Sequence, residues 1–210
     1  FRSLRRLIAH NFKGGIKELW VTLTYKETIT DPNTIYNDFK IFIKKIRKHY
    51  GHVEYISVIE PHAKYGKFHL HVLLKSPKKL YIENSHLAEL WGKGFTKTKR
   101  LSEKDSIANY VVSYLTNLDT SELNETDNSE SGKKSIIKGN RLYLYPKGLR
   151  IYRKSKGIIN PDEGIDIKEN LIEKYNLYPI PEYIANYSIK DNNEEDILII
   201  KEFYKRRRTK

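Results

Sequence analysis

Two histidines interrupt an apolar run in Gly66-Lys67-Phe68-His69-Leu70-His71-Val72-Leu73-Leu74. In an extended strand, successive side chains point to opposite faces. The two imidazoles should therefore share one face, while the apolar side chains between and around them enter a core on the other. Two neutral imidazoles side by side on a strand supply half of a divalent-metal site. The stretch alone also fits a strand whose outer face simply carries two polar residues.

The preceding segment supplies a third ligand for such a site. Residues 53–60 read as a strand and residues 61–66 as a turn, so the two strands should be antiparallel neighbours. Glu60 then lies near His69, and His62 is the alternative third ligand. Strict alternation places Glu60 on the face of Ile56 and Val58, so we expect a bulge near Pro61 to aim it at the histidines.

Elements on either side are also readable. Residues 18–25 alternate like a strand, and Thr30-Asp31-Pro32 begins a helix with a basic face that ends at Gly51. Residues 84–91 are predicted as a helix and residues 92–98 as a strand. The basic residues 1–17 form either a short helix or an arm.

A helix over residues 107–117 follows a possible capping box at residues 102–105. Tyr110 and Tyr114 lie one turn apart on one of its faces, and Ile107, Val111 and Leu115 lie on another. Since the chain has 16 tyrosines, a packing role for this pair is the alternative to a chemical one.

Composition narrows the function classes. The chain has 210 residues, 39% of them hydrophobic, and no cysteine, which excludes disulfides, thiolate metal sites and cysteine nucleophiles. The net charge of +13 suits a polyanion, with nucleic acid favoured over an anionic membrane surface. No apolar run approaches the roughly 20 residues that span a bilayer, so we expect no membrane association and a cytoplasmic location.

The second half of the chain changes character twice. Residues 118–137 begin as an acidic, polar segment that we predict to be a mobile loop. Residues 133–157 interleave basic residues with tyrosines, which suits either a groove that follows a nucleic-acid backbone or a lysine-protected sheet edge. We expect one domain over residues 1–160 and a small helical appendage over residues 161–210, with helices at 167–175 and 193–204 and a basic tail.

Four stretches together resemble the HUH endonucleases, specifically the rolling-circle replication initiator (Rep) proteins of small plasmids and phages. These are Trp20-Val21-Thr22-Leu23-Thr24-Tyr25, Val58-Ile59-Glu60 with the histidine strand, Glu89-Leu90-Trp91-Gly92-Lys93-Gly94-Phe95, and Tyr110-Val111-Val112-Ser113-Tyr114-Leu115-Thr116-Asn117. The likeness covers residues 19–117, with a weaker match over residues 150–161. The tyrosines follow the histidine pair, whereas relaxases have the reverse order.

The resemblance implies an α+β fold, with a central antiparallel β-sheet, flanking helices and a ferredoxin-like (RRM-like) core. It also implies an enzyme that nicks and rejoins single-stranded or hairpin origin DNA through a 5′-phosphotyrosine. Tyr110 would be the nucleophile and Tyr114 its partner, with Mn²⁺ or Mg²⁺ on Glu60, His69 and His71. A separate helicase is expected, because the chain has no G-x-x-x-x-G-K-[ST] phosphate loop.

One departure from the family concerns phosphate binding. Members often carry a lysine three residues after each tyrosine, where this chain has Ser113 and Asn117. Lys67, Arg150 or Arg153 would have to substitute. The full set that we expect to bind DNA is Lys67, Arg150, Tyr152, Arg153 and Lys154.

Three other functions remain open from the sequence. The first is a non-catalytic single-stranded nucleic-acid-binding protein, which needs neither the histidines nor the tyrosines. The second is a related single-strand transposase. The third is a zinc hydrolase, which lacks here a clear third histidine and an H-E-x-x-H helix.

Overall fold

A computed structural model describes residues 1–29, 31–62, 68–101, 107–116, 118–119, 136–137, 140–192 and 194–207. Within these, the side chains of residues 109–110, 114–116, 118–119, 136–137 and 140 are outside the description. The chain divides into two compact units, Phe1–Pro161 and Asp162–Lys210, which are described separately.

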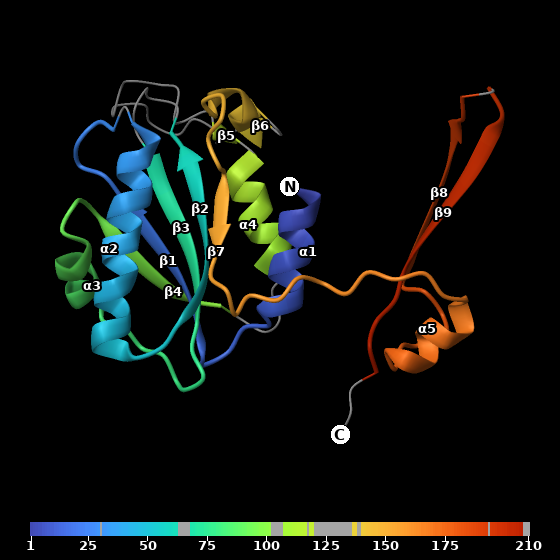
Figure 1. Ribbon diagram of the computed structural model, residues 1–210, viewed down its shortest axis with the longest axis horizontal. Coiled ribbons are helices and arrows are strands. Elements are labelled where there is room, and N and C mark those ends of the chain that lie inside the picture. The colour runs from blue at the N-terminus through green and yellow to red at the C-terminus, as the bar shows by residue number, and fades with distance from the viewer. Residues whose placement is uncertain are drawn as a thin grey trace, which may run out of the picture. The chain divides into compact units, whose positions relative to one another are not determined.

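The first unit is built on a five-stranded antiparallel sheet in the order β4-β1-β3-β2-β7 (Figure 1). Its strands are β1 (Glu18–Thr24), β2 (Glu54–Pro61), β3 (Phe68–Lys75), β4 (Thr96–Arg100) and β7 (Tyr152–Lys154). Helices flank this sheet, which confirms the predicted α+β class with a central antiparallel sheet.

Helices α2 (Pro32–Tyr50) and α3 (Asn84–Trp91) cover one face of the sheet. The side chain of Asp31 accepts a hydrogen bond from the backbone N–H of Asn33, and Pro32 occupies the first turn. Gly51 ends α2 with a φ of 80°, a conformation that favours glycine. These boundaries match the predicted start and stop.

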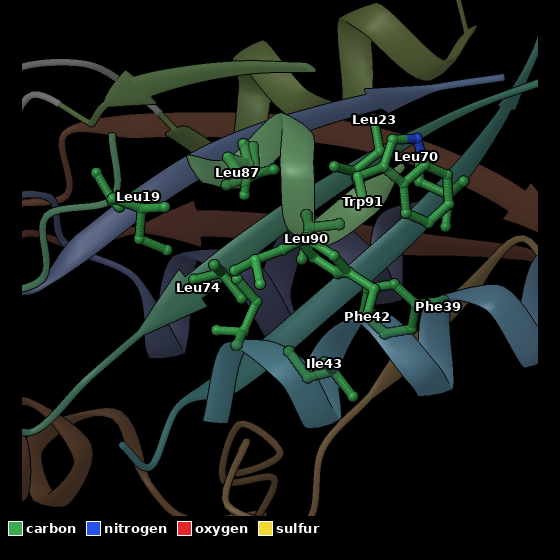
Figure 2. Packing of buried hydrophobic residues seen from close by; sticks show 14 of the residues in the cluster. Leu19, Leu23, Phe39, Phe42, Ile43, Leu70, Leu74, Leu87, Leu90 and Trp91 are labelled. Atoms are coloured by element: carbon green, nitrogen blue, oxygen red, sulfur yellow. The ribbon is translucent and has the colours of Figure 1, made fainter. Parts of the chain in front are cut away.

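The core on this face contains the apolar residues of the histidine strand. Leu70 and Leu74 of β3 pack with Leu23 of β1 and with Phe42 of α2 (Figure 2). The predicted alternation of β3 is therefore confirmed for its apolar half.

The opposite face is covered by α1 (Arg2–Asn11) and α4 (Ile107–Thr116), as Figure 1 shows. Residues 1–17 thus contribute a helix rather than an arm. A second apolar cluster lies beneath the two helices and includes Leu4, Trp20, Ile56 and Val111. The capping box expected at residues 102–105 lies outside the described residues.

The segment after α4 returns to the sheet through short elements. Strands β5 (Leu118–Asp119) and β6 (Ile136–Ile137) pair antiparallel, so the ends of the predicted loop lie side by side. Residues 120–135 between them are outside the description, and the predicted mobility stays a prediction. The 3₁₀-helix η2 (Asn140–Leu144) then leads to the edge strand β7.

The second unit is only partly helical. Helix α5 (Lys168–Lys174) confirms the helix expected at residues 167–175, but the predicted final helix at residues 193–204 is wrong. Strands β8 (Tyr183–Lys190) and β9 (Asp196–Phe203) form an antiparallel hairpin there. The run Ile197-Leu198-Ile199-Ile200 is rich in β-branched residues, which pack well on a pleated sheet and lose rotamer freedom in a helix.

None of the helices in the described part of the chain combines the length and apolar character needed to cross a bilayer.

Candidate metal centre

Strand register brings the three predicted ligands to one face of the sheet. Glu60 of β2 lies directly opposite His69 of β3, and Val58 lies opposite His71. Residues directly opposite in an antiparallel pair share a face. The pairing runs without interruption to Pro61, so the expected bulge is wrong: the face of Val58 is already the face of the histidines.

The ligand atoms of Glu60, His69 and His71 all lie within 4.8 Å of one another. The Nε2 atom of His71 contacts Oε2 of Glu60, and Nδ1 of His69 lies 3.8 Å from the same oxygen. Glu60 and His71 are buried, whereas the His69 side chain is 32% exposed. The group therefore opens to solvent at His69. His62, the alternative ligand, lies outside this group, with its ring centroid 5.5 Å from that of His69.

Two neighbours orient the His71 imidazole. Its Nδ1 atom lies 3.4 Å from Oγ1 of Thr22, to which the indole N–H of Trp20 donates a hydrogen bond of 3.2 Å. The Trp20 ring also meets the imidazole edge-on, with 5.3 Å between centroids. These contacts leave Nε2 directed at Glu60. A bond at the second ring nitrogen is the usual way in which a protein fixes a metal-binding histidine.

A buried arginine completes the surroundings of Glu60. The Nη1 atom of Arg141, in η2, lies 3.1 Å from Oε1 of Glu60 and donates a hydrogen bond of 2.9 Å to the carbonyl of Pro61. Arg141 is 3% exposed. The two carboxylate oxygens of Glu60 are thus divided, with Oε1 towards Arg141 and Oε2 towards the imidazoles.

The electrostatics keep Glu60 ionised. Burial alone would raise its pKa, but hydrogen bonding to His69 and His71 and the charges of His71 and Arg141 outweigh burial and lower the pKa to about 2. A carboxylate that is ionised at neutral pH beside two imidazoles is a donor set that suits a divalent cation. The residues present therefore fit the Mn²⁺ or Mg²⁺ expected from the sequence, without distinguishing between the two ions.

A cleft of about 390 Å³ lies over this group. Besides the three ligands it is lined by Trp20, Thr22, Thr24, His62, Phe95, Lys97 and Lys99. Lys97 pairs with Thr22 and Lys99 with Trp20, so both lysines belong to the face that carries the ligands. The sequence analysis missed them because it placed β4 at residues 92–98, which left the Lys97-Thr98-Lys99 alternation unread.

Helix α4 carries the two predicted catalytic tyrosines over the same face. Its residues Ile107 and Val111 are buried in the cluster that includes Trp20, as the predicted core stripe requires. The side chains of Tyr110 and Tyr114 lie outside the description. Their chemical role stays a prediction.

The predicted DNA-binding residues of β7 are spread over both faces of the sheet. Tyr152 lies opposite Val58 and thus in the cross-strand row of His71. Arg153 points to the other face, where its guanidinium carbon lies 3.5 Å from the ring centroid of Tyr36. The Lys154 ammonium donates to the carbonyl of Ile158, Arg150 is exposed, and Lys67 lies outside the described residues. A second cleft, of about 790 Å³, runs along β7.

Comparison with known proteins adds one match. Residues 18–119 match a family model described as replication-associated protein ORF2. Neither the comparison with curated proteins nor that with solved structures gave a significant match. The matched range runs from β1 through β5 and contains the three candidate ligands and all of α4. The match supports a role for this protein as a replication initiator that binds DNA.

Proposed function

We propose that this protein is a rolling-circle replication initiator that nicks and rejoins single-stranded DNA at an origin. The observation that carries the proposal is the Glu60, His69 and His71 group, which lies in a cleft within the range matched by the replication-associated family. The proposal includes the HUH mechanism, a divalent cation on these three residues, and a tyrosine of α4 as nucleophile.

The chemistry proceeds by exchange of one phosphodiester for another. The phenol oxygen of Tyr110 attacks the scissile phosphorus and loses its proton, a P–O bond forms to tyrosine, and the P–O3′ bond breaks. The departing 3′ oxygen takes up a proton and leaves a 3′-OH that primes synthesis. Because the phosphotyrosyl bond replaces the bond that was broken, the strand can later be rejoined. Tyr114, one helical turn away in sequence, would accept the strand in a second transfer.

The residues of the cleft assist by position and charge. Glu60, His69 and His71 would hold the cation, which when bound neutralises charge on a non-bridging phosphate oxygen. Thr22 and Trp20 keep Nε2 of His71 turned towards Glu60. Lys97 and Lys99 line the same cleft and add positive charge on the ligand face. They are better placed for this than Arg153, which lies on the opposite face.

A covalent-adduct assay tests the proposal. The protein is mixed with a pool of single-stranded and hairpin DNA oligonucleotides, with Mn²⁺ or with EDTA, and separated on a denaturing gel. We expect a slower protein–DNA band only with the metal, and mass spectrometry should map the linked residue to Tyr110. Tyr110→Phe should abolish this adduct, while Tyr143→Phe, at an 88% exposed tyrosine, should leave it unchanged.

Two outcomes would correct or replace the proposal. An adduct mapped to Tyr114 keeps the mechanism and changes the nucleophile. Tight binding without an adduct on any substrate, including the origin of the element that encodes the protein, would favour the non-catalytic nucleic-acid-binding protein. The basic and aromatic lining of the cleft along β7 is the feature that such a protein would use.

A further inference from the structure

We propose that Phe95, Lys97 and Lys99 form a track for single-stranded DNA along β4, beside the metal centre. In this track Phe95 stacks a base, and the two lysines pair with backbone phosphates next to the one that is cut. The inference deepens the proposed function, on which the choice of DNA as ligand rests. Neither the matched family's description nor the sequence patterns singled out these three residues.

The two lysines are placed by strand pairing. Lys97 is in the cross-strand row that contains Thr22 and His71, and Lys99 is in the next row with Trp20. Both side chains are exposed and both line the cleft over the metal centre. At 3.2–3.4 Å per residue their Cα atoms are about 7 Å apart, which is comparable with the spacing of neighbouring phosphates on an extended strand.

Phe95 is held firmly although its ring is 64% exposed. Its carbonyl accepts hydrogen bonds from the backbone N–H of Thr24, at 2.9 Å, and from the Thr24 hydroxyl, at 3.1 Å. Gly94 packs so closely that a Cβ atom there would lie 2.5 Å from the Thr24 carbonyl oxygen. The backbone is thus fixed at a site where no side chain larger than hydrogen fits, and it presents an aromatic ring at the mouth of the cleft.

Simpler explanations exist for each residue by itself. Lysines on an edge strand discourage pairing with other chains, and single exposed apolar residues are common on protein surfaces. The case for a track is that all three residues face the same cleft as the metal centre. Aromatic platforms next to positive charge are the usual means of binding single strands, because every base has a face that can stack.

The test measures equilibrium binding without cleavage. A fluorescein-labelled single-stranded 20-mer of fixed sequence is titrated with the full chain in EDTA, by fluorescence anisotropy, at several NaCl concentrations. Each phosphate contact contributes about 0.7 to the slope of log K against log salt for a single strand. We expect Lys97→Ala/Lys99→Ala to reduce that slope by about 1.4. Phe95→Ala should weaken binding about 5-fold or more, with recovery in Phe95→Tyr.

Matched controls separate the track from general charge. Lys44→Ala/Lys48→Ala removes the same charge from exposed positions of α2, on the other face of the sheet, and should leave the slope unchanged. Tyr81→Ala removes another exposed ring and should leave the affinity unchanged. An equal loss in variant and control, an unchanged slope in Lys97→Ala/Lys99→Ala, or no binding of the oligonucleotide by the unmodified protein would overturn the track.

The two proposals fail separately. If the protein binds as expected but forms no tyrosine adduct, the track stands and the nuclease proposal fails. If the adduct forms but the lysine and Phe95 variants bind like the unmodified protein, the nuclease proposal stands and the track is overturned.

Discussion

Two buried glutamates lie at opposite ends of one face of the sheet. Glu18 is the first residue of β1 and is 3% exposed, and Glu60 lies near the end of β2 and is 2% exposed. Between them, the same face carries the apolar cluster beneath α1 and α4. The two carboxylates are equally buried, yet their partners differ in kind.

Glu18 is bonded to the main chain. Its Oε2 atom accepts hydrogen bonds from the backbone N–H groups of Lys13, at 3.0 Å, and Gly14, at 2.7 Å. Lys75, directly opposite on β3, places its ammonium 3.8 Å from Oε1. These contacts hold the loop that leads into β1, and no ligand can take the place of a backbone amide without unfolding that loop.

Glu60 is instead surrounded by side chains. Its carboxylate lies among His69, His71 and Arg141, and two of these three can themselves bind a cation. A cation that binds between the imidazoles and Oε2 replaces contacts without disturbing the backbone. The comparison teaches that the burial of a carboxylate does not reveal its use, whereas the exchangeability of its partners does.

The largest expected effect separates the two glutamates by activity. Glu60→Gln removes the only negative charge from the candidate ligand set. Since a bound cation contributes several kcal/mol to charge stabilisation, we expect adduct formation to slow by roughly 1,000-fold. Glu18→Gln should change the rate less than about 3-fold, because Glu18 contacts neither the ligands nor the cleft among the described residues. The adduct assay with Mn²⁺ measures both, and similar losses in the two variants would contradict the distinction.

A second prediction concerns the ion pair at Glu60. Glu60→Ala leaves the Arg141 guanidinium, whose side chain is 4% exposed, without its carboxylate. Breaking a buried pair on one side typically costs about 3–5 kcal/mol in the free energy of unfolding, and we expect this range here. The double variant Glu60→Ala/Arg141→Met should recover most of the loss, because it removes the stranded charge. Urea unfolding of the single and double variants measures the coupling, and additive losses would show that the pair is not coupled.

The sequence predicted the Glu60 side of this comparison better than its surroundings. Strand alternation and a short turn are local signals, and they were enough to group Glu60 with His69 and His71. Arg141 reaches Glu60 from 81 residues further along the chain, through a short 3₁₀-helix without a periodic pattern. A contact of that kind depends on the tertiary path of the chain, which no local pattern encodes.

The other misses have related causes. Lys97 and Lys99 were overlooked because the predicted strand began four residues too early, and element boundaries are set by pairing partners rather than by the strand's own residues. The β9 strand was predicted as a helix because its partner, β8, was not recognised as a strand. By contrast, the start and end of α2 depend on Asp31, Pro32 and Gly51 within the helix itself, and they were predicted correctly.

The smallest expected effect is a difference in pH dependence between the two glutamates. Burial raises the pKa of Glu18, against the opposing effects of the Gly14 and Lys13 amides and of Lys75, whereas the pKa of Glu60 is lowered to about 2. The contribution of Glu60 to stability should therefore be present above its unfolded pKa, near 4.5, and be lost as the pH falls towards 2. That of Glu18 should be complete below 4.5 and decline as the pH rises through its folded pKa.

The measurement is the free energy of unfolding of the unmodified chain, minus that of each Gln variant, as a function of pH. The subtraction cancels the titration of every other carboxylate, so the sign of each slope belongs to one residue. We expect the difference for Glu60→Gln to increase with rising pH and that for Glu18→Gln to decrease. Slopes of the same sign would mean that burial dominates at both ends of the face, and that the imidazoles and Arg141 do not stabilise the Glu60 carboxylate beyond the cost of removing it from water.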